Sequence, residues 1–274
     1  ERYDGATLVD YTDGERLFYG HLLPYTGYAH TNSLNNTTDS AASATALASG
    51  YKTTNGRVGR DADGKDLFTL TELAGSMGMA TAVMSTEVQT GATPAGFSAH
   101  ADDRDDTDDI LASQKVLQEK YGTIIEGDYD YYDPYGVYQL EQRINATLNT
   151  LHQNEKGFFM MYEEAYIDKH SHNQEKEKAT WAVFRFNQAI ALFMEYAFYH
   201  PDTFVIITAD HGGHDRTHGT DMPEDMTIPM FYIGEAFEAG KRFSGGSILD
   251  IAPTIAKLMG AAPAPAWEGK SLIL

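Results

Sequence analysis

The feature that most constrains the fold is the alternation of short apolar runs with longer helical patterns. The apolar runs are TAVMST (81–86), FFMMYE (158–163), TFVIITAD (203–210) and PMFYIG (229–234). The helical patterns cover residues 67–76, 174–199 and 248–260. Runs of this length are typical of buried strands, and strands that alternate with helices predict an α/β fold. We therefore expect a three-layer sandwich, in which helices flank a mainly parallel central sheet.

Length and composition favour one domain. A chain of 274 residues with 42% hydrophobic and 12% aromatic content can bury a sizeable core. Residues 101–109 (ADDRDDTDD) form a charge run, which indicates a solvated loop or a helix start. Residues 126–138 are aromatic, acidic and rich in turn formers, which indicates an inserted loop. The prediction is a single domain over residues 1–274 with an inserted loop region near 101–140.

The charge balance restricts the possible partners. Forty acidic residues oppose 20 basic ones, so the formal net charge is −20. This field disfavours nonspecific binding to nucleic acids or anionic membranes, and an anionic substrate would need local positive charge such as a bound metal ion. The chain has no cysteine, which excludes disulfides, zinc–thiolate sites and thiol catalysis. No apolar run is long enough to predict a membrane span.

Asp and His residues gather just after two of the predicted strands, where ligands collect in parallel α/β sheets. The segment IDKHSH contains Asp168, His170 and His172, and TADHGGHDRTHG contains Asp210, His211, His214, Asp215 and His218. Two such clusters of nitrogen and oxygen donors predict a site for zinc or a similar ion. An aspartate directly after a buried run also needs a charged partner.

Residues 36–50 (NTTDSAASATALASG) raise a different question, because one acid, Asp39, precedes Ser40 and a run of small residues. Asp39 is suited to cap a helix that the alanines propagate. Ser40 could equally be a nucleophile at the positive end of that helix. From the residues alone, both interpretations stay open.

The motif TTDSAASATA resembles the nucleophile motif of the alkaline phosphatases. The blocks TGATPAGFSAHADDR, EEAYIDKHSH, TADHGGH and THG follow in the order found in that family. The last third of the chain resembles the ending shared across the alkaline phosphatase/sulfatase superfamily. The resemblance covers roughly residues 20–274 and implies a phosphomonoester hydrolase of the alkaline phosphatase fold.

The resemblance also assigns roles to individual residues. Ser40 would attack phosphorus and form a phosphoserine, its oxygen stabilised by a second zinc ion. The implied ligands are Asp168, His172 and His218 for a first zinc, Asp210, His211 and Ser40 for the second, and Thr93 and Glu163 for a magnesium ion. The implied phosphate-binding residues are Arg104, whose planar fork can hold two phosphoryl oxygens, and Lys169, which acts through water.

Two departures from the family pattern matter. Gly91 stands where members often carry Asp or His, so one contact near the magnesium is expected to be absent. The family also opens with a strand that ends in Gly-Asp-Gly, whose aspartate bridges the second zinc and the magnesium, and nothing here matches it. Asp10 and Asp13 lie too close to the next block to replace it. We expect an N-terminally incomplete chain that has little activity unless the strand is supplied.

Alternatives to the phosphomonoesterase remain. The first is a phosphodiesterase or nucleotide pyrophosphatase of the same superfamily, and the second is a metal-binding fragment with little activity. By family resemblance we expect small phosphomonoesters and inorganic phosphate as ligands, a homodimer, and a periplasmic or extracellular location.

Overall fold

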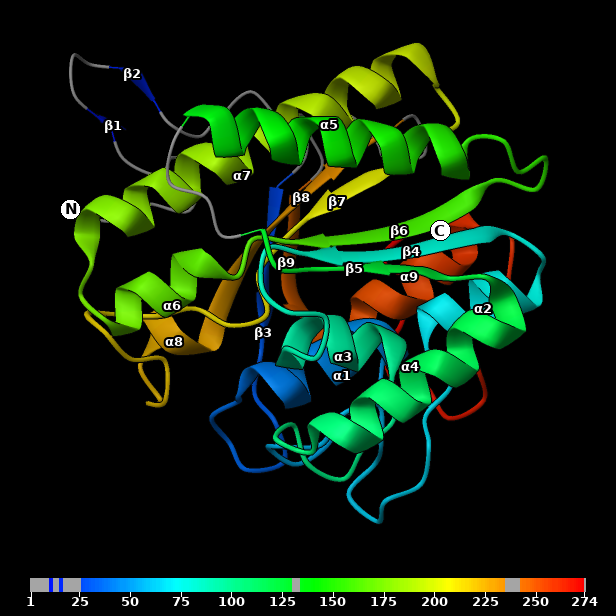
Figure 1. The fold of residues 1–274 in the computed structure, drawn as a ribbon. Coiled ribbons are helices and arrows are strands. Elements are labelled where there is room, and N and C mark those ends of the chain that lie inside the picture. The colour runs from blue at the N-terminus through cyan, green and yellow to red at the C-terminus, as the bar shows by residue number, and fades with distance from the viewer. Residues whose placement is uncertain (1–9, 12–14, 17–25, 130–133, 235–241, 274) are drawn as a thin grey trace.

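The computed structural model describes residues 10–11, 15–16, 26–129, 134–234 and 242–273. In Figure 1 the strands from residue 26 onward lie across the middle of the molecule, with the helices at 134–151 and 176–199 on one side and those at 40–49, 70–76, 92–98, 107–121 and 251–258 on the other. The strands are β1 Asp10–Tyr11, β2 Glu15–Arg16, β3 Thr26–His30, β4 Ala80–Ser85, β5 Ile124–Glu126, β6 Phe158–Glu163, β7 Val205–Ile207, β8 Thr227–Ile233 and β9 Arg242–Ser247. The helices are α1 Ser40–Ser49, α2 Leu70–Ser76, α3 Ala92–Ser98, α4 Thr107–Tyr121, α5 Pro134–Leu151, α6 Tyr166–His172, α7 Lys176–Tyr199, α8 Pro223–Met226, η2 Ile248–Asp250 and α9 Ile251–Leu258. The α/β fold with helices on both sides is confirmed.

The strands pair in two main sheets. One has the order β5-β4-β6 and is parallel throughout. The other has the order β7-β8-β3-β9, in which β3 and β9 are parallel while β8 runs antiparallel to both of its neighbours. The second sheet is therefore mixed. Parallel pairing fits the buried apolar sequence of β4, because strands covered on both faces read as continuous apolar runs.

The central sheet, which was expected to be continuous, is interrupted between β6 and β7. Among the described residues, β6 pairs only with β4, and β7 pairs only with β8. Every residue of both strands lines one cavity of about 1670 Å³. Phe186 and Phe193 of α7 and Ile255 of α9, on opposite sides of the strands, also line it. An apolar slot, open at the free edges of two strands, thus lies where the sheet was expected to be continuous.

The ends of β7 show why the predicted strand at 203–210 is longer than the observed one. The ladder with β8 stops at the pair Ile207 and Phe231. Pro229, two residues before Phe231 in β8, lies where a longer β7 would pair, and it has no amide hydrogen to donate to that strand. The Thr208 hydroxyl donates to the Pro229 carbonyl at 3.0 Å, so a side chain takes over where the ladder ends.

The region 101–140 differs from the expected inserted loop. Helix α4 begins at Thr107 inside the charge run, and the Asp106 carboxylate caps it by accepting from the Asp109 amide at 3.3 Å. Strand β5 and the start of α5 lie in the same region, and residues 130–133 are outside the described part. The acids of the charge run therefore serve as a cap and as first-turn charges, which the helix dipole favours.

A close crossing of α1 and α3 fixes the position of α1. A Cβ atom placed on Gly96 would lie 2.6 Å from the Cβ of Ala44, closer than real side chains approach. Glycine and alanine at the crossing let the two backbones come together. After Ser40, every residue of α1 is buried. The start of α1 is therefore held by packing along the whole helix.

A buried ion pair that sequence reasoning missed joins β6 to α7. The Arg185 guanidinium donates to both carboxylate oxygens of Glu164 at 2.6 Å, and each side chain is 1% exposed. Thr86 donates to the same carboxylate at 2.9 Å, and Arg185 also donates to the Tyr129 carbonyl at 3.0 Å. Helix α7 is thereby fastened beside the carboxyl end of β6.

None of the helices in the described part combines the length and apolar character needed to cross a bilayer.

We expect Arg185→Met to lower the free energy of unfolding by about 3–5 kcal/mol, because it leaves the Glu164 carboxylate buried without its partner. Urea denaturation followed by circular dichroism measures the change. Lys115→Met is the control, since Lys115 forms only an exposed pair with Glu119 at 3.9 Å and should lose less than about 1 kcal/mol. Equal losses in the two variants would contradict the assignment.

Candidate functional site

Ser40 is the first residue of α1 and lies at a well-capped helix start. The Asp39 carboxylate accepts from the Ala42 amide at 2.9 Å and from the Gly56 amide at 3.0 Å. The cap predicted from sequence is confirmed, and it leaves the Ser40 side chain free to face the cavity that it lines. A helix N-terminus presents unpaired amides and a positive dipole end, which favour an anion there.

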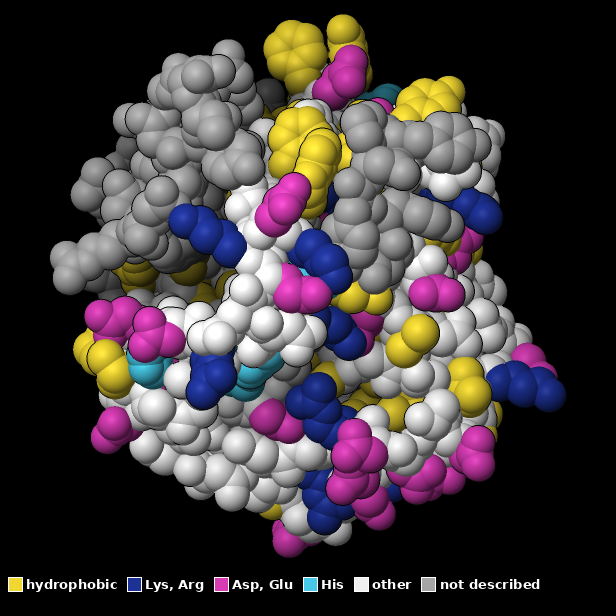
Figure 2. Space-filling view, turned by 60° about the vertical axis from the view of Figure 1, so that its left-hand side comes forward, with side chains coloured by type: hydrophobic (Ala, Val, Ile, Leu, Met, Phe, Trp, Pro, Cys, Tyr) yellow, Lys and Arg dark blue, Asp and Glu magenta, His cyan; other side chains and the backbone are white. Residues whose placement is uncertain are grey.

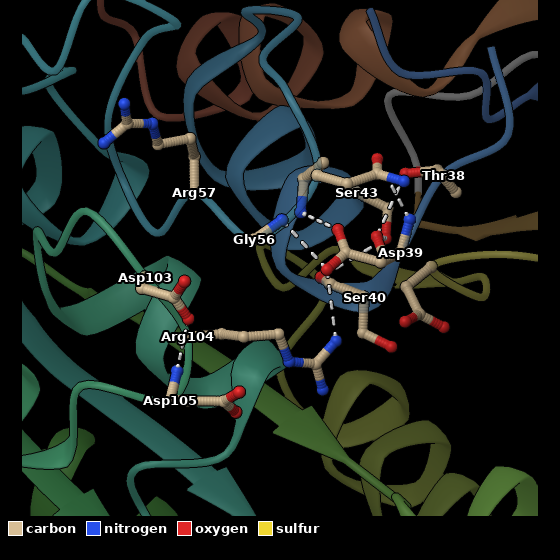
Figure 3. A network of polar contacts seen from close by, with 12 residues as sticks. Thr38, Asp39, Ser40, Ser43, Gly56, Arg57, Asp103, Arg104 and Asp105 are labelled. Atoms are coloured by element: carbon tan, nitrogen blue, oxygen red, sulfur yellow. Dashed lines mark hydrogen bonds and ion pairs between the residues drawn. The ribbon is translucent and has the colours of Figure 1, made fainter. Parts of the chain in front are cut away.

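Arg104 reaches the same place from the loop before α4, as Figure 3 shows. Its backbone amide donates to the Gly56 carbonyl at 2.8 Å, and its guanidinium donates to the Asp39 carboxylate at 3.3 Å. Asp39 therefore links the helix start to the arginine. Because one contact engages only one nitrogen of the guanidinium, the group retains donors for an anion beside Ser40.

Asp168, His172 and His218 offer one ligand atom each, all within 4.8 Å of one another. Asp168 and His172 are one turn apart on α6, with 3.3 Å between the carboxylate and Nε2. His172 Nδ1 is 2.9 Å from the Arg216 carbonyl, a contact that orients the ring with Nε2 toward Asp168. Nδ1 of His218 is buried and has no hydrogen-bond partner among the described residues. This donor set fits a zinc ion.

His211 joins this group to Ser40. Its Nε2 is 3.1 Å from Ser40 Oγ and 3.2 Å from the Asp210 carboxylate, while its Nδ1 is 2.9 Å from the Gly212 carbonyl. Its ring stacks on His218 with centroids 3.6 Å apart. Burial lowers the pKa of His211, but the carboxylates of Asp210 and Asp168 outweigh burial and raise it. Asp210 and His211 thus form a second pair of nitrogen and oxygen donors next to the serine.

Glu163, at the carboxyl end of β6, is strongly perturbed. Burial and the negative charge of Glu87 raise its pKa to about 8, despite hydrogen bonds from Ser85 at 2.5 Å and from Thr93. A carboxyl group with this environment gains most from a bound cation. The structure brings Thr93 and Glu163 together, as the magnesium assignment requires.

Lys169 makes a contact that the sequence did not indicate. Its ammonium lies 2.6 Å from the carboxylate of Glu87, a buried residue two positions after β4. Sequence reasoning missed Glu87, although its place just after a buried strand resembles that of Glu163 and Asp210. That position was the available signal.

His170 and His214, the two histidines of the Asp/His clusters that are not implied as metal ligands, have other partners. Nδ1 of His170 is 2.7 Å from the Glu175 carboxylate, and Nδ1 of His214 is 2.7 Å from the Asp225 carboxylate. The hydrogen bond to Asp225 raises the pKa of His214. His170 therefore contacts the segment that follows α6, and His214 links the loop after β7 to α8. Asp13 lies outside the described residues, and Asp10 lies in β1, which pairs only with β2 within the described part and joins neither main sheet.

All predicted site residues line one cavity. They are Ser40, Thr93, Arg104, Glu163, Asp168, Lys169, His172, Asp210, His211 and His218. The structure thus brings together residues from distant parts of the chain, while their chemical roles remain predictions. On the face drawn in Figure 2, acidic and basic side chains are interspersed, and histidine side chains reach the surface between them.

Comparison with known proteins gives consistent matches. A sequence profile of the family described as Alkaline phosphatase matches residues 10–130 and 130–230. Alkaline phosphatase 4 of Bacillus subtilis (strain 168) is 29% identical over 227 residues, or 64% of this chain and 49% of that protein. The structure of the alkaline phosphatase from the Antarctic bacterium TAB5 gives a TM-score of 0.75 at 23% identity, covering 94% of this chain and 95% of that one.

A mutant of the TAB5 phosphatase with Mg bound in a site named M3 gives a TM-score of 0.74 at 22% identity, with coverages of 94% and 95%. The likeness to these solved structures concerns the fold. The chain spans about half the length of the curated relatives it matches.

We expect Asp39→Ala to lower the free energy of unfolding by about 1–2 kcal/mol, because α1 loses its cap. Asp39→Asn is the matched control: its amide oxygen can still accept from the Ala42 amide and cap the helix, while its NH₂ group cannot accept from Arg104 or the Gly56 amide, so we expect a smaller loss than in Asp39→Ala. Urea denaturation distinguishes the two variants. A loss as large in Asp39→Asn as in Asp39→Ala would show that the cap is not the stabilising contact.

Proposed function

Since the chain belongs to the alkaline phosphatase family, we propose that it hydrolyses phosphomonoesters through a phosphoserine formed on Ser40. The family match supports a phosphatase. The observation that carries the finer proposal is the place of Ser40 Oγ, 3.1 Å from His211 Nε2, beside Arg104 and in the same cavity as the three-residue metal group.

Different groups of the protein bind the phosphoryl oxygens, attack phosphorus and position these groups. Backbone amides at the start of α1 and the guanidinium of Arg104 hold the phosphoryl oxygens and orient phosphorus toward Ser40. The Ser40 oxygen forms a bond to phosphorus while the bond to the leaving oxygen breaks. Water then hydrolyses the phosphoserine and releases inorganic phosphate. Asp39 positions both the helix start and the arginine through its shared carboxylate.

The donor sets fit the metals of the proposal. Asp168, His172 and His218 would hold the first zinc. Their three ligand atoms within 4.8 Å support this assignment, as does the buried Nδ1 of His218, which lacks a hydrogen-bond partner in the described part of the chain. Asp210 and His211 would hold the second zinc next to Ser40. Bound zinc ions stabilise the serine and leaving-group oxygens and lower the pKa of the attacking water.

Thr93 and Glu163 would hold a magnesium ion, which prefers oxygen ligands. The TAB5 phosphatase, a protein of the same fold, has Mg in its M3 site in one variant. The high pKa of Glu163 indicates a carboxyl group whose negative charge lacks sufficient compensation, which a cation would provide.

Monoesters are favoured over diesters because the serine motif and Arg104 belong to the phosphomonoesterase pattern, and a monoester offers the guanidinium more free phosphoryl oxygens. Comparing hydrolysis of p-nitrophenyl phosphate with that of bis(p-nitrophenyl) phosphate decides between them. Faster diester hydrolysis would support the phosphodiesterase instead. We also propose a homodimer and a periplasmic or extracellular location, both on family resemblance alone.

A second candidate is a metal-binding protein with little activity. The slot between β6 and β7 favours it, because Glu163 and Asp210 follow these two strands and the sheet between them is interrupted. The family's Gly-Asp-Gly strand, which brings a further carboxylate, has no counterpart in the matched motifs. Retained zinc without turnover would support this candidate.

We expect Ser40→Ala to abolish phosphoenzyme formation and to lower turnover at least about a thousandfold, because the attacking oxygen is removed. Acid quenching after incubation with radioactive inorganic phosphate measures the phosphoenzyme. Ser49→Ala, at the other end of the same helix, should leave the labelling intact. Full turnover in Ser40→Ala would refute the role of Ser40 as nucleophile.

We expect the chain to hold two zinc ions, and His172→Ala to release one of them at micromolar zinc, because one of the three donors of the first site is lost. Elemental analysis after dialysis gives the stoichiometry. His170→Gln is the control, since His170 pairs with Glu175 and should not change the zinc content. Two retained zinc ions in His172→Ala would exclude it as a ligand.

A further inference from the structure

The space beside Gly91 is already filled by another residue. Gly91 immediately precedes α3, and a Cβ atom placed there would lie 2.0 Å from the Glu87 carboxyl carbon and 2.1 Å from one of its oxygens. The three nearest atoms all belong to that carboxylate. The carboxylate of Glu87 therefore occupies the volume that a side chain at residue 91 would enter.

Glu87 is held firmly in this position. It is 7% exposed, its amide donates to Ser85 Oγ at 3.1 Å, and its carbonyl accepts from the Asp128 amide at 2.7 Å. Gly127 packs against the same carbonyl so closely that a Cβ there would lie 2.3 Å from the oxygen. The side chain is thus directed by a fixed backbone toward the cavity that it lines.

The charges around Glu87 leave an excess of negative charge. Its carboxylate repels that of Glu163, which also feels Asp210, and the Lys169 ammonium at 2.6 Å is the cation paired with Glu87. One ammonium does not balance three neighbouring carboxylates in a largely buried place. The oxygens of Glu87, Glu163 and Thr93 are of the kind that magnesium binds.

We propose that Glu87 is one of the groups that hold the magnesium ion in this chain, its carboxylate replacing a side chain from residue 91. The proposal rests on the proposed function, and it supplies the contact that the glycine at 91 was expected to leave absent. The carboxylate enters the same volume from four residues earlier in the chain.

The alternative role for Glu87 is to position Lys169 and nothing more. The two roles differ in the effect of losing the Glu87 carboxylate, and Lys169→Met is the control for loss of the ion pair. If Glu87 binds magnesium, Lys169→Met removes a competing cation, so the affinity for magnesium stays equal or rises. If Glu87 only positions Lys169, neither Glu87→Gln nor Lys169→Met changes magnesium affinity.

Titration calorimetry of the zinc-loaded chain with Mg²⁺, without substrate, tests the proposal. We expect Glu87→Gln to weaken Mg²⁺ binding about 10- to 100-fold, the usual effect of losing a group that supports a metal site. Lys169→Met should bind Mg²⁺ at least as tightly as the unaltered chain. Unchanged affinity in Glu87→Gln, or no Mg²⁺ binding by the unaltered chain, would overturn the proposal.

A carboxylate swap provides the second test. Glu87→Ala should weaken Mg²⁺ binding, and adding Gly91→Asp should restore it to within about tenfold, because the new side chain enters the vacated volume. Gly91→Asp alone should clash with Glu87 and lower the melting temperature. A double variant that folds, by circular dichroism, yet binds Mg²⁺ no better than Glu87→Ala would refute the proposal.

These measurements separate the inference from the proposed function. Because Mg²⁺ binding is measured without substrate, the same differences should appear in a Ser40→Ala background. Magnesium binding that depends on Glu87, in a chain without turnover, would sustain the inference while the proposed phosphatase activity fails.

Discussion

The site depends on one electrostatic constraint: several carboxylates converge on a single cavity with few cations to balance them. Glu163 and Asp210 come from the ends of two different strands, Glu87 follows a third, and Asp168 lies on α6. Lys169 and Arg104 are each already engaged with a carboxylate. In a partly buried place such an excess of negative charge raises the free energy of the folded chain unless cations enter. We therefore expect bound cations to stabilise this arrangement of carboxylates.

That constraint explains how much of the site could be predicted from the sequence. Asp210 was identifiable because an aspartate directly after a buried apolar run is costly without a partner, and that signal is local, whereas Glu163 was assigned by the family resemblance. The partners are not local. The pairing of Lys169 with Glu87 joins residues far apart in the chain, as does the pairing of Arg185 with Glu164. Arg185 lies within an otherwise apolar helical pattern, and nothing nearby in sequence indicated which carboxylate it meets.

The same division holds for the fold. The runs that became β4 and β6 were located to within a residue or two, because each is a continuous apolar run, although β4 is buried along most of its length and β6 is mainly half-buried. Pairing was not accessible in this way. The antiparallel direction of β8 and the interruption between β6 and β7 depend on which strand edges meet, and edge pairing leaves little trace in side-chain pattern. The charge run left a loop and a helix start both open, because acids favour both, and the structure begins helix α4 within it at Thr107.

The divided sheet has a consequence for how the molecule unfolds. Each group of strands has its own ladder of backbone hydrogen bonds, and no ladder rung joins β6 to β7 in the described part of the chain. Stability in proteins is distributed over contiguous cooperative units, whose opening can be followed residue by residue through amide exchange. The two ladders are instead connected by side-chain packing, since residues of β4 and β6 share one hydrophobic core cluster with residues of β3, β8, α1, α2 and α9. We therefore expect cooperativity across the molecule to depend on side-chain packing, and the two sheets to be protected from amide exchange as separate units.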